Sequence, residues 1–297
     1  MHLGNIYAAL MSWLEIRSRG GLWVLRHEDL DPQRSRFEYA SQIEDDLRWL
    51  GLDWDEGGLD GRGCRGPYIQ SRRSDIYAGY LRILTEKGLT YPCTCTRADI
   101  MATQAPHQTD GRVVYAGTCR PPRLGGMGAP RPGRPAAVRL YVPEHEVKFY
   151  DLIRGYRTVE LSGHCGDFVL RRADGAWAYQ LAVVVDDALM GITDVVRGDD
   201  LLTSAAQQIY LFGLLGFEAP AYAHFPLLVD AEGRRLCKRD RSLEMGELRL
   251  RYTARELVGK IAHMAGLRDT DTPVTPSQLI EGFRIESLRR GPIECCL

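Results

Sequence analysis

The first part of the chain alternates helical stripes of hydrophobic residues with short apolar runs. A stripe with intervals of three and one residues predicts a first helix that ends at the glycine pair 20–21. Its members are Ile6, Ala9, Leu10, Trp13 and Leu14. The run 22–25 predicts a short buried strand, and the apolar spacing over 43–50 predicts a second helix. Ser71 is a candidate N-cap for a third helix that continues to Gly88.

The alternation returns in the second half of the chain. The apolar, valine-rich run 181–185 predicts another buried strand, which ends at two aspartates. A helix is expected over 203–215 and a strand over 225–229, and the segment after about residue 243 is expected to be mostly helical. Helices that alternate with apolar strands indicate an α/β fold with a parallel, doubly wound sheet.

The pattern breaks between residues 92 and 165. This stretch contains a cysteine cluster and a run rich in proline, glycine and arginine over 121–135, which predicts a loop. An inserted region therefore interrupts the sheet, which the following segment completes. The predicted regions are 1–91 and 166–242 for the two halves of a nucleotide-binding domain, 92–165 for the insertion and 243–297 for a helical C-terminal region.

Composition narrows the class of protein but does not identify its function. The 44% hydrophobic and 26% charged content is ordinary for a globular protein. No apolar run approaches the length of a membrane span, and the start lacks an export signal, so a cytoplasmic protein is expected. The net charge of −1 does not point to nucleic acid. Residues 231–260, however, contain nine Lys or Arg against five Asp or Glu. This excess could bind phosphates or could be a solvated helical face.

Two segments could bind a polyphosphate. His2-Leu3-Gly4-Asn5 lies at the start of the first helix, where free N–H groups and a partial positive charge favour anions. An incidental capping histidine would explain His2 equally. Leu236-Cys237-Lys238-Arg239-Asp240 follows a strand, and Lys238 could neutralise phosphates there or belong to an exposed basic turn.

A third candidate is Glu28, which follows the strand at 22–25. A carboxylate at the carboxyl edge of a parallel sheet lies where ligands of open α/β folds bind, and it could hold an ammonium group. The alternative is an N-cap or a surface cluster of acids.

Three of the eight cysteines are spaced as a group. Cys93, Cys95 and Cys119 could supply three thiolates to a zinc ion, which leaves a tetrahedral site one ligand short. Tyr115 and His107 are the nearby candidates for the fourth position. Reactive or buried thiols without a metal are the alternative.

Taken in order, these segments resemble one family, the class I aminoacyl-tRNA synthetases of the glutamyl type. His2-Leu3-Gly4-Asn5 is similar to the first signature, and Arg235-Leu236-Cys237-Lys238-Arg239 is similar to the second. The stretch from Arg26 to Asp31 resembles the family's Arg-x-Glu-Asp-x-Asp segment, and the block 183–200 resembles its central block. The resemblance extends to about residue 245.

The resemblance implies roles for particular residues. Glu28, Tyr179 and Arg197 would bind glutamate, although buried-core or ion-pair roles for Tyr179 and Arg197 remain open. ATP, with Mg²⁺, would be held by the residues His2, Gly4, Asn5 and Lys238. The second signature usually has lysine and serine where this chain has Arg235 and Cys237, which is expected to alter ATP affinity.

A short branch of the family, the glutamyl-queuosine tRNA(Asp) synthetases, shares a Cys-x-Cys…Tyr-x-x-x-Cys pattern. In this chain the pattern implies one zinc ion bound by Cys93, Cys95, Tyr115 and Cys119. Only about 55 residues follow Asp240, too few for an anticodon-binding module. The branch implies activation of L-glutamate with ATP and its transfer to queuosine in tRNA(Asp), and a monomer is expected. The alternatives are a truncated enzyme that charges tRNA(Glu) and an inactive zinc- and RNA-binding remnant.

The chain begins at Met1, inside the first signature, whereas family members have a preceding strand and an Arg…Ala-Pro-Ser-Pro-Thr-Gly segment. The Arg and Ser of that segment help to bind glutamate. We therefore expect the central strand and part of the amino-acid pocket to be absent here. Either the start was assigned at an internal methionine or the chain is a fragment.

Overall fold

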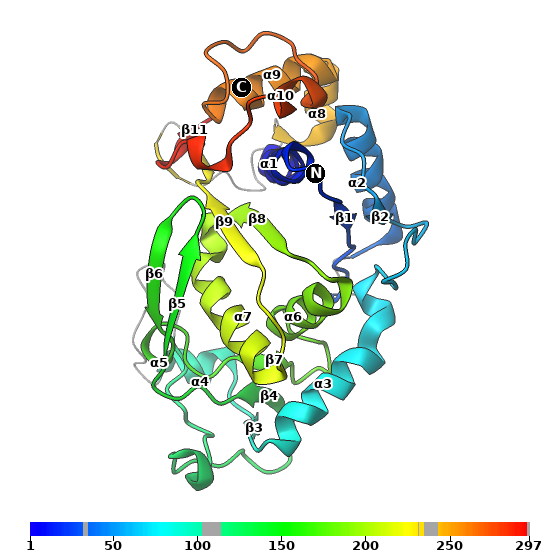
Figure 1. Cartoon of the computed structure of the whole chain (residues 1–297). Helices are drawn as coiled ribbons and strands as arrows, with labels where there is room; N and C mark the ends of the chain where they lie inside the picture. Colours follow the sequence, from blue (N-terminus) through cyan, green and yellow to red (C-terminus); the bar gives the residue numbers. More distant parts are fainter. Residues whose placement is uncertain (32–34, 103–113, 231, 235–242, 296–297) are drawn as a thin grey trace.

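Helices and strands alternate through most of the computed structural model, which describes residues 1–31, 35–102, 114–230, 232–234 and 243–295 (Figure 1). The α-helices are α1 (Leu3–Ser18), α2 (Phe37–Leu50), α3 (Ser74–Glu86), α4 (Arg97–Ala102), α5 (Leu161–His164), α6 (Tyr179–Met190), α7 (Leu202–Leu215), α8 (Met245–Arg251), α9 (Ala254–Met264) and α10 (Pro276–Ile280). The 3₁₀ helices are η1 (Gln70–Arg73), η2 (Pro122–Leu124), η3 (Asp199–Leu201) and η5 (Ile285–Ser287). Among the described residues, no helix has both the length and the apolar character that crossing a membrane requires.

The described strands form four sheets. In the largest, with the order β6-β5-β9-β8, three strands run parallel and β6 is an antiparallel edge. Its strands are β5 (Glu146–Asp151), β6 (Gly155–Glu160), β8 (Asp194–Gly198) and β9 (Ala221–Phe225). The smaller sheets are the parallel pair β1 (Val24–Leu25) and β2 (Glu56–Gly57), the antiparallel set β3 (Thr90–Cys93), β4 (Ala137–Leu140) and β7 (Val169–Arg171), and the parallel pair β10 (Leu228–Val229) and β11 (Ile293–Glu294). Parallel strands joined through helices confirm the predicted α/β class.

The first helix is the centre of the larger core. α1 packs against β8 and α10, so its apolar residues are covered on more than one side. Leu10 and Leu14 of α1 share one hydrophobic cluster with Leu257 and Ile261 of α9. Figure 1 shows the C-terminal helices α8, α9 and α10 gathered beside α1. The helical stripe and the mainly helical character of the C-terminal region were both predicted correctly.

The prediction of a strand over 181–185 was wrong, because these residues lie in α6. Eight of the twelve residues of α6 are buried, including all of 181–187, so this stretch has no exposed positions and shows no helical period. Continuous apolar runs do not distinguish a buried strand from a buried helix. Gly191, in the left-handed conformation with φ 66°, ends the helix.

Three smaller expectations also need correction. Ser71 is not a helix N-cap: it lies in η1, and its backbone N–H and hydroxyl both donate to Asp29. The strand expected over 22–25 comprises only β1, and the strand expected over 225–229 divides at Pro226 between β9 and β10. Proline lacks the N–H that a continuous ladder needs.

The predicted insertion contains two different structures. Its cysteines lie around the β3-β4-β7 sheet, whereas the β5–β6 hairpin pairs with β9 through Asp151 and Tyr222 and so extends the main sheet. The predicted domain boundaries themselves remain predictions.

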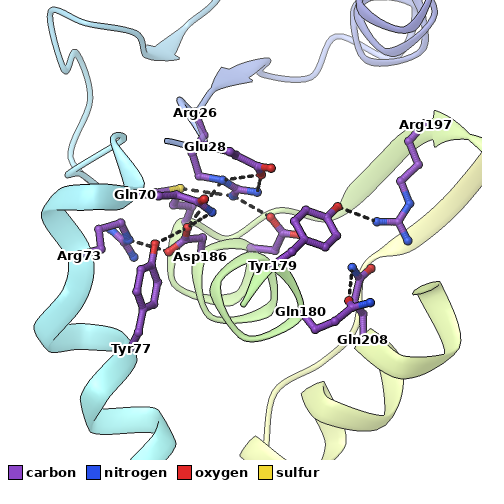
Figure 2. Close-up of polar contacts among 12 residues, drawn as sticks. Arg26, Glu28, Gln70, Arg73, Tyr77, Tyr179, Gln180, Asp186, Arg197 and Gln208 are labelled. Carbon is purple, nitrogen blue, oxygen red and sulfur yellow. Dashed lines mark hydrogen bonds and ion pairs between the residues drawn. The ribbon is translucent and has the colours of Figure 1, made fainter. Parts of the chain in front are cut away.

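A buried carboxylate joins α6 to the α3 region. Asp186 is fully buried and accepts hydrogen bonds from Arg73 (Nε, 2.6 Å), Gln70 (2.8 Å) and the Tyr77 hydroxyl (2.9 Å), as Figure 2 shows in part. Arg73 is itself only 1% exposed. Removing one member of a buried pair leaves the other charge without compensation, which is far costlier than removing an exposed pair.

We therefore expect Asp186→Ala to lower the free energy of unfolding by about 3–5 kcal/mol, measured by urea denaturation. The matched control is Asp174→Ala, which breaks a 2.5 Å pair with Arg172 in which both side chains are about half exposed. That change should cost about 0–1 kcal/mol. Equal losses in the two variants would contradict the structural role of Asp186.

Candidate functional site

A cavity of about 500 Å³ lies between β1 and β8. Residues 22–26 and Glu28 form one wall, residues 190–197 form the opposite wall, and α6 contributes Tyr179 and Val183. Among the described residues, β1 pairs only with β2 and β8 only with β9, so the two walls belong to separate sheets. On one wall the cavity includes residues just beyond the carboxyl end of β1, where open α/β sheets bind ligands, and on the other it includes β8 and the segment before it. The expected absence of a central strand stays a prediction.

Arg26 holds two carboxylates at the cavity. Its terminal nitrogens lie 2.9 Å from Glu28 and 2.7 Å from Asp187, and its side chain is largely buried (Figure 2). Burial raises the pKa of Asp187, and the charge of Arg26 opposes that rise. The carboxylate of Glu28 is the more accessible of the two, with 38% of its side chain exposed. Glu28 can therefore meet a ligand while Arg26 fixes its position.

Arg197 comes from β8 on the opposite wall. Its Nη1 lies 3.5 Å from the Tyr179 hydroxyl, its Nη2 donates to the carbonyl of Leu201 at 3.3 Å, and its Nε donates to His224. The guanidinium also stacks over the Tyr222 ring, 5.1 Å from the ring centre. Of the five guanidinium N–H groups, these contacts use one on each nitrogen. Among the described residues no hydrogen bond uses the second N–H of either terminal nitrogen, so two donors are available to a carboxylate.

The structure thus brings Glu28, Tyr179 and Arg197 to one cavity, as the sequence analysis required. Figure 2 shows Tyr179 beside Arg197, with Glu28 and Arg26 on its other side. Burial raises the pKa of the Tyr179 hydroxyl, so this group stays protonated and can donate or accept a hydrogen bond. A carboxylate and a guanidinium on facing walls suit a small zwitterion.

The first-signature residues cap α1 and are not among the residues that line this cavity. The His2 Nδ1 accepts from the N–H of Gly4 at 3.1 Å, and the Asn5 side chain accepts from the N–H of His2 at 3.2 Å. His2 therefore caps α1, which is the alternative role that the sequence analysis gave for this residue. A Cβ at Gly4 would lie 3.1 Å from the His2 ring, so a larger residue here would require the ring to shift.

The second-signature residues Arg235, Leu236, Cys237, Lys238 and Arg239 lie outside the described residues, as does His107. The segment that follows them is described. Glu244 forms a β-bridge with His2, and the N–H of Met245 donates to the carbonyl of Met1 at 2.9 Å. The chain just after the second signature is thus attached to the first signature.

The predicted zinc ligands converge in a separate place. The sulfur atoms of Cys93, Cys95 and Cys119 lie within 4.8 Å of one another. The Tyr115 hydroxyl lies 3.3 Å from the Cys93 sulfur and 3.8 Å from the Cys95 sulfur, and it accepts the N–H of Cys119 at 2.7 Å. Tetrahedral zinc–thiolate geometry separates sulfurs by about 3.8 Å, close to the 3.6 Å between Cys95 and Cys119. The donor set fits a metal ion.

Burial and hydrogen bonds shift the pKa values within this cluster in opposite directions. It raises the pKa of the Cys95 thiol to about 11 and also raises the pKa of Tyr115. Burial opposes ionisation of Cys119 as well, yet donors that include a backbone N–H and Tyr115 leave the pKa of Cys119 below its ordinary value. Cys93 and Tyr115 are almost completely buried, so a metal ion here would be shielded from solvent.

Sequence reasoning missed several groups that shape the site. Arg26 and Asp187 were within recognised blocks but had no role assigned. The pairing of His224 with Asp151 had no sequence signal, because the two residues are 73 positions apart and meet only through the pairing of β9 with β5.

The fold is of the α/β class, and its cavity presents a carboxylate and a guanidinium from facing walls, beside the end of β1. Residues 1–266 match the family model for the catalytic domain of class I tRNA synthetases (E and Q), and the chain belongs to this family.

Individual relatives are similar over almost the whole chain. A glutamyl-Q tRNA(Asp) synthetase of Symbiobacterium thermophilum is 46% identical over 99% of this chain and 91% of its own length. The enzyme of that name from Nitratidesulfovibrio vulgaris matches with the same identity and coverage. Among solved structures, a glutamate tRNA ligase of Elizabethkingia meningosepticum in complex with its amino acid matches 99% of this chain with a TM-score of 0.81 and 26% identity. This chain spans 64% of that ligase.

Proposed function

We propose that this protein activates L-glutamate with ATP and transfers the glutamyl group to queuosine in tRNA(Asp). The observation that carries the proposal is the meeting of Glu28, Tyr179 and Arg197 at one cavity in a chain of this family. The identity of 46% to relatives named glutamyl-Q tRNA(Asp) synthetase supports the choice of tRNA and base.

In the proposed complex, the charges of the cavity orient glutamate. Arg197 pairs with a substrate carboxylate through its two available N–H groups, and Glu28 neutralises the substrate ammonium. The Tyr179 hydroxyl, close to Arg197, adds a directional contact. Because glutamate carries one ammonium and two carboxylates, this arrangement leaves the second carboxylate available for reaction.

ATP is proposed to lie at the first signature, with Mg²⁺. The N-terminus of α1 at His2, Gly4 and Asn5 favours phosphate, and Lys238 supplies a positive charge from the following signature. The attachment of Glu244 to His2 supports this arrangement, because Lys238 is only six residues before Glu244.

The proposed reaction has two steps. An oxygen of the glutamate carboxylate attacks the α-phosphorus of ATP, and pyrophosphate leaves as glutamyl-adenylate forms. A nucleophile on the queuosine base then attacks the glutamyl carbonyl carbon, and AMP leaves. Positioning and charge stabilisation, which this cavity provides, supply most of the catalysis in such transfers.

We also propose that Cys93, Cys95, Tyr115 and Cys119 hold one zinc ion. Four protein ligands would close the coordination sphere, which is typical of a structural site. The ion would stabilise the β3-β4-β7 region, since none of the four residues lines the cavity.

The function is tested by pyrophosphate exchange and glutamate transfer. The proposal requires glutamate-dependent exchange without tRNA, followed by transfer of labelled glutamate to tRNA(Asp) only when it contains queuosine. Transfer to tRNA(Glu) would instead support a truncated glutamyl-tRNA synthetase. Absence of exchange would support an inactive zinc- and RNA-binding remnant.

Glu28→Gln should lower kcat/KM for glutamate by about 10- to 100-fold in the exchange assay, because the substrate ammonium loses its charged partner. The control is Glu86→Gln on α3, where the carboxylate is 68% exposed and 3.8 Å from Arg82. An unchanged kcat/KM in Glu28→Gln would remove this residue from the proposed glutamate site.

The purified protein should contain about one zinc ion per chain, and Cys93→Ser should lower that content and the thermal midpoint, because a thiolate ligand is lost. Cys64→Ser changes an exposed cysteine outside the cluster and should alter neither quantity. Metal content measured by mass spectrometry tests the assignment. An unchanged zinc stoichiometry in Cys93→Ser would exclude it.

A further inference from the structure

Three adjacent strands of the main sheet contribute one buried hydrogen-bonded chain. Asp151 ends β5, His224 lies in β9 and Arg197 lies in β8. The Asp151 carboxylate is 2.6 Å from the His224 Nδ1, and the His224 Nε2 is 3.0 Å from the Arg197 Nε. Both Asp151 and His224 are completely buried. The chain ends at the guanidinium that faces the cavity.

The chemistry of the partners determines the state of the imidazole. Arginine has only donors, so the His224 Nε2 must be an unprotonated acceptor. The proton of the neutral ring is then on Nδ1 and is donated to Asp151. The second oxygen of Asp151 accepts the N–H groups of Ile153 (3.0 Å) and Arg154 (2.7 Å), so the carboxylate is fixed from the other side.

We infer that His224, held in one tautomer by Asp151, is a positioning residue that orients Arg197 for the amino-acid substrate. The inference rests on the proposed function, because it takes Arg197 as the carboxylate-binding group. An arginine anchored through Nε has a fixed guanidinium plane, and its remaining terminal N–H groups then point in set directions. Without the His224 acceptor, Arg197 would keep its charge but lose this orientation.

The surroundings favour the neutral imidazole. Burial lowers the pKa of His224, and Asp151 opposes this effect. The charged groups around the ring are Asp151 from β5, Arg197 from β8 and Asp199 from η3, which pairs with Arg154 at 2.5 Å. The neighbour on its own strand is Tyr222, whose ring stacks on His224. Protonation would remove the acceptor and place a second cation beside Arg197.

Three substitutions test whether the orientation of Arg197 affects glutamate binding separately from its charge and from the size of the side chains that support it. His224→Phe keeps a ring without an acceptor, whereas a glutamine at this position can accept from Arg197 and donate to Asp151. Asp151→Asn keeps the size of the side chain. Its oxygen must accept the backbone N–H groups, so its amide donates to Nδ1 and forces the proton onto Nε2, where it opposes the Arg197 donor.

In glutamate-dependent pyrophosphate exchange, His224→Phe and Asp151→Asn should raise the KM for glutamate by about tenfold or more, with the KM for ATP unchanged. His224→Gln should recover much of the loss. In the unaltered protein the KM for glutamate should be constant at pH 6.5 and above and should rise only at lower pH, because burial lowers the pKa of His224 below its ordinary value of about 6.5. The profile of His224→Gln should be flatter, because glutamine does not titrate.

Several outcomes would overturn the inference. Unaltered KM values for glutamate in folded His224→Phe and Asp151→Asn would do so, and so would identical pH profiles for the unaltered protein and His224→Gln. If Asp151→Asn or His224→Phe fails to fold, the pH profiles of the unaltered protein and His224→Gln decide whether the inference holds. Absence of exchange in the unaltered protein overturns the proposed function, and the inference with it. Exchange with unchanged KM values in the variants overturns the inference alone.

Discussion

The positive charge of Arg26 allows two carboxylates to face the same cavity. Glu28 follows β1 and Asp187 belongs to α6, and both lie within 3 Å of the one guanidinium. Without it, their mutual repulsion in a partly buried site would push them apart or favour protonation. Because Asp186 at the same time binds Arg73, consecutive residues of α6 connect the helical side of the molecule to the cavity wall. The cavity's shape depends on these ion pairs.

The opposite wall presents the guanidinium of Arg197, whose supporting contacts are also largely buried. Arg197 is held by His224, Leu201 and the Tyr222 ring, so its direction is fixed before any ligand arrives. Buried charges contribute little net stability, because desolvation offsets much of their attraction. Their value here is preorganisation: a site whose donors already point correctly loses less conformational entropy on binding. In both walls, buried contacts fix the position of a charged group although they add little net stability.

The periodicity of the sequence predicted the helices in which buried and partly exposed residues alternate. The stripe of α1 identified a helix, whereas the run 181–185 was assigned to a strand because a helix buried all round has no period. Glu28 was a candidate because it follows a predicted strand, whereas Arg197 came from the resemblance. Asp151 and His224 could not be found in either way, since their contact depends on the order of strands in the sheet, which spacing along the chain does not contain.

A metal ion at the proposed zinc site would stabilise a region whose hydrophobic cluster is small. The hydrophobic cluster around Tyr91, Cys93, Tyr115 and Cys119 is small, and small cores leave a region marginally stable. Polar contacts add to it, because Asp167 receives two 2.9 Å hydrogen bonds from Arg120 and a further bond from Tyr91. A closed four-ligand ion would join β3 to the loop at residue 119 without requiring more apolar area. Since this cluster and the cavity share no residue, the ion's contribution would be to the fold of this region, and the ion would not contact the proposed glutamate site.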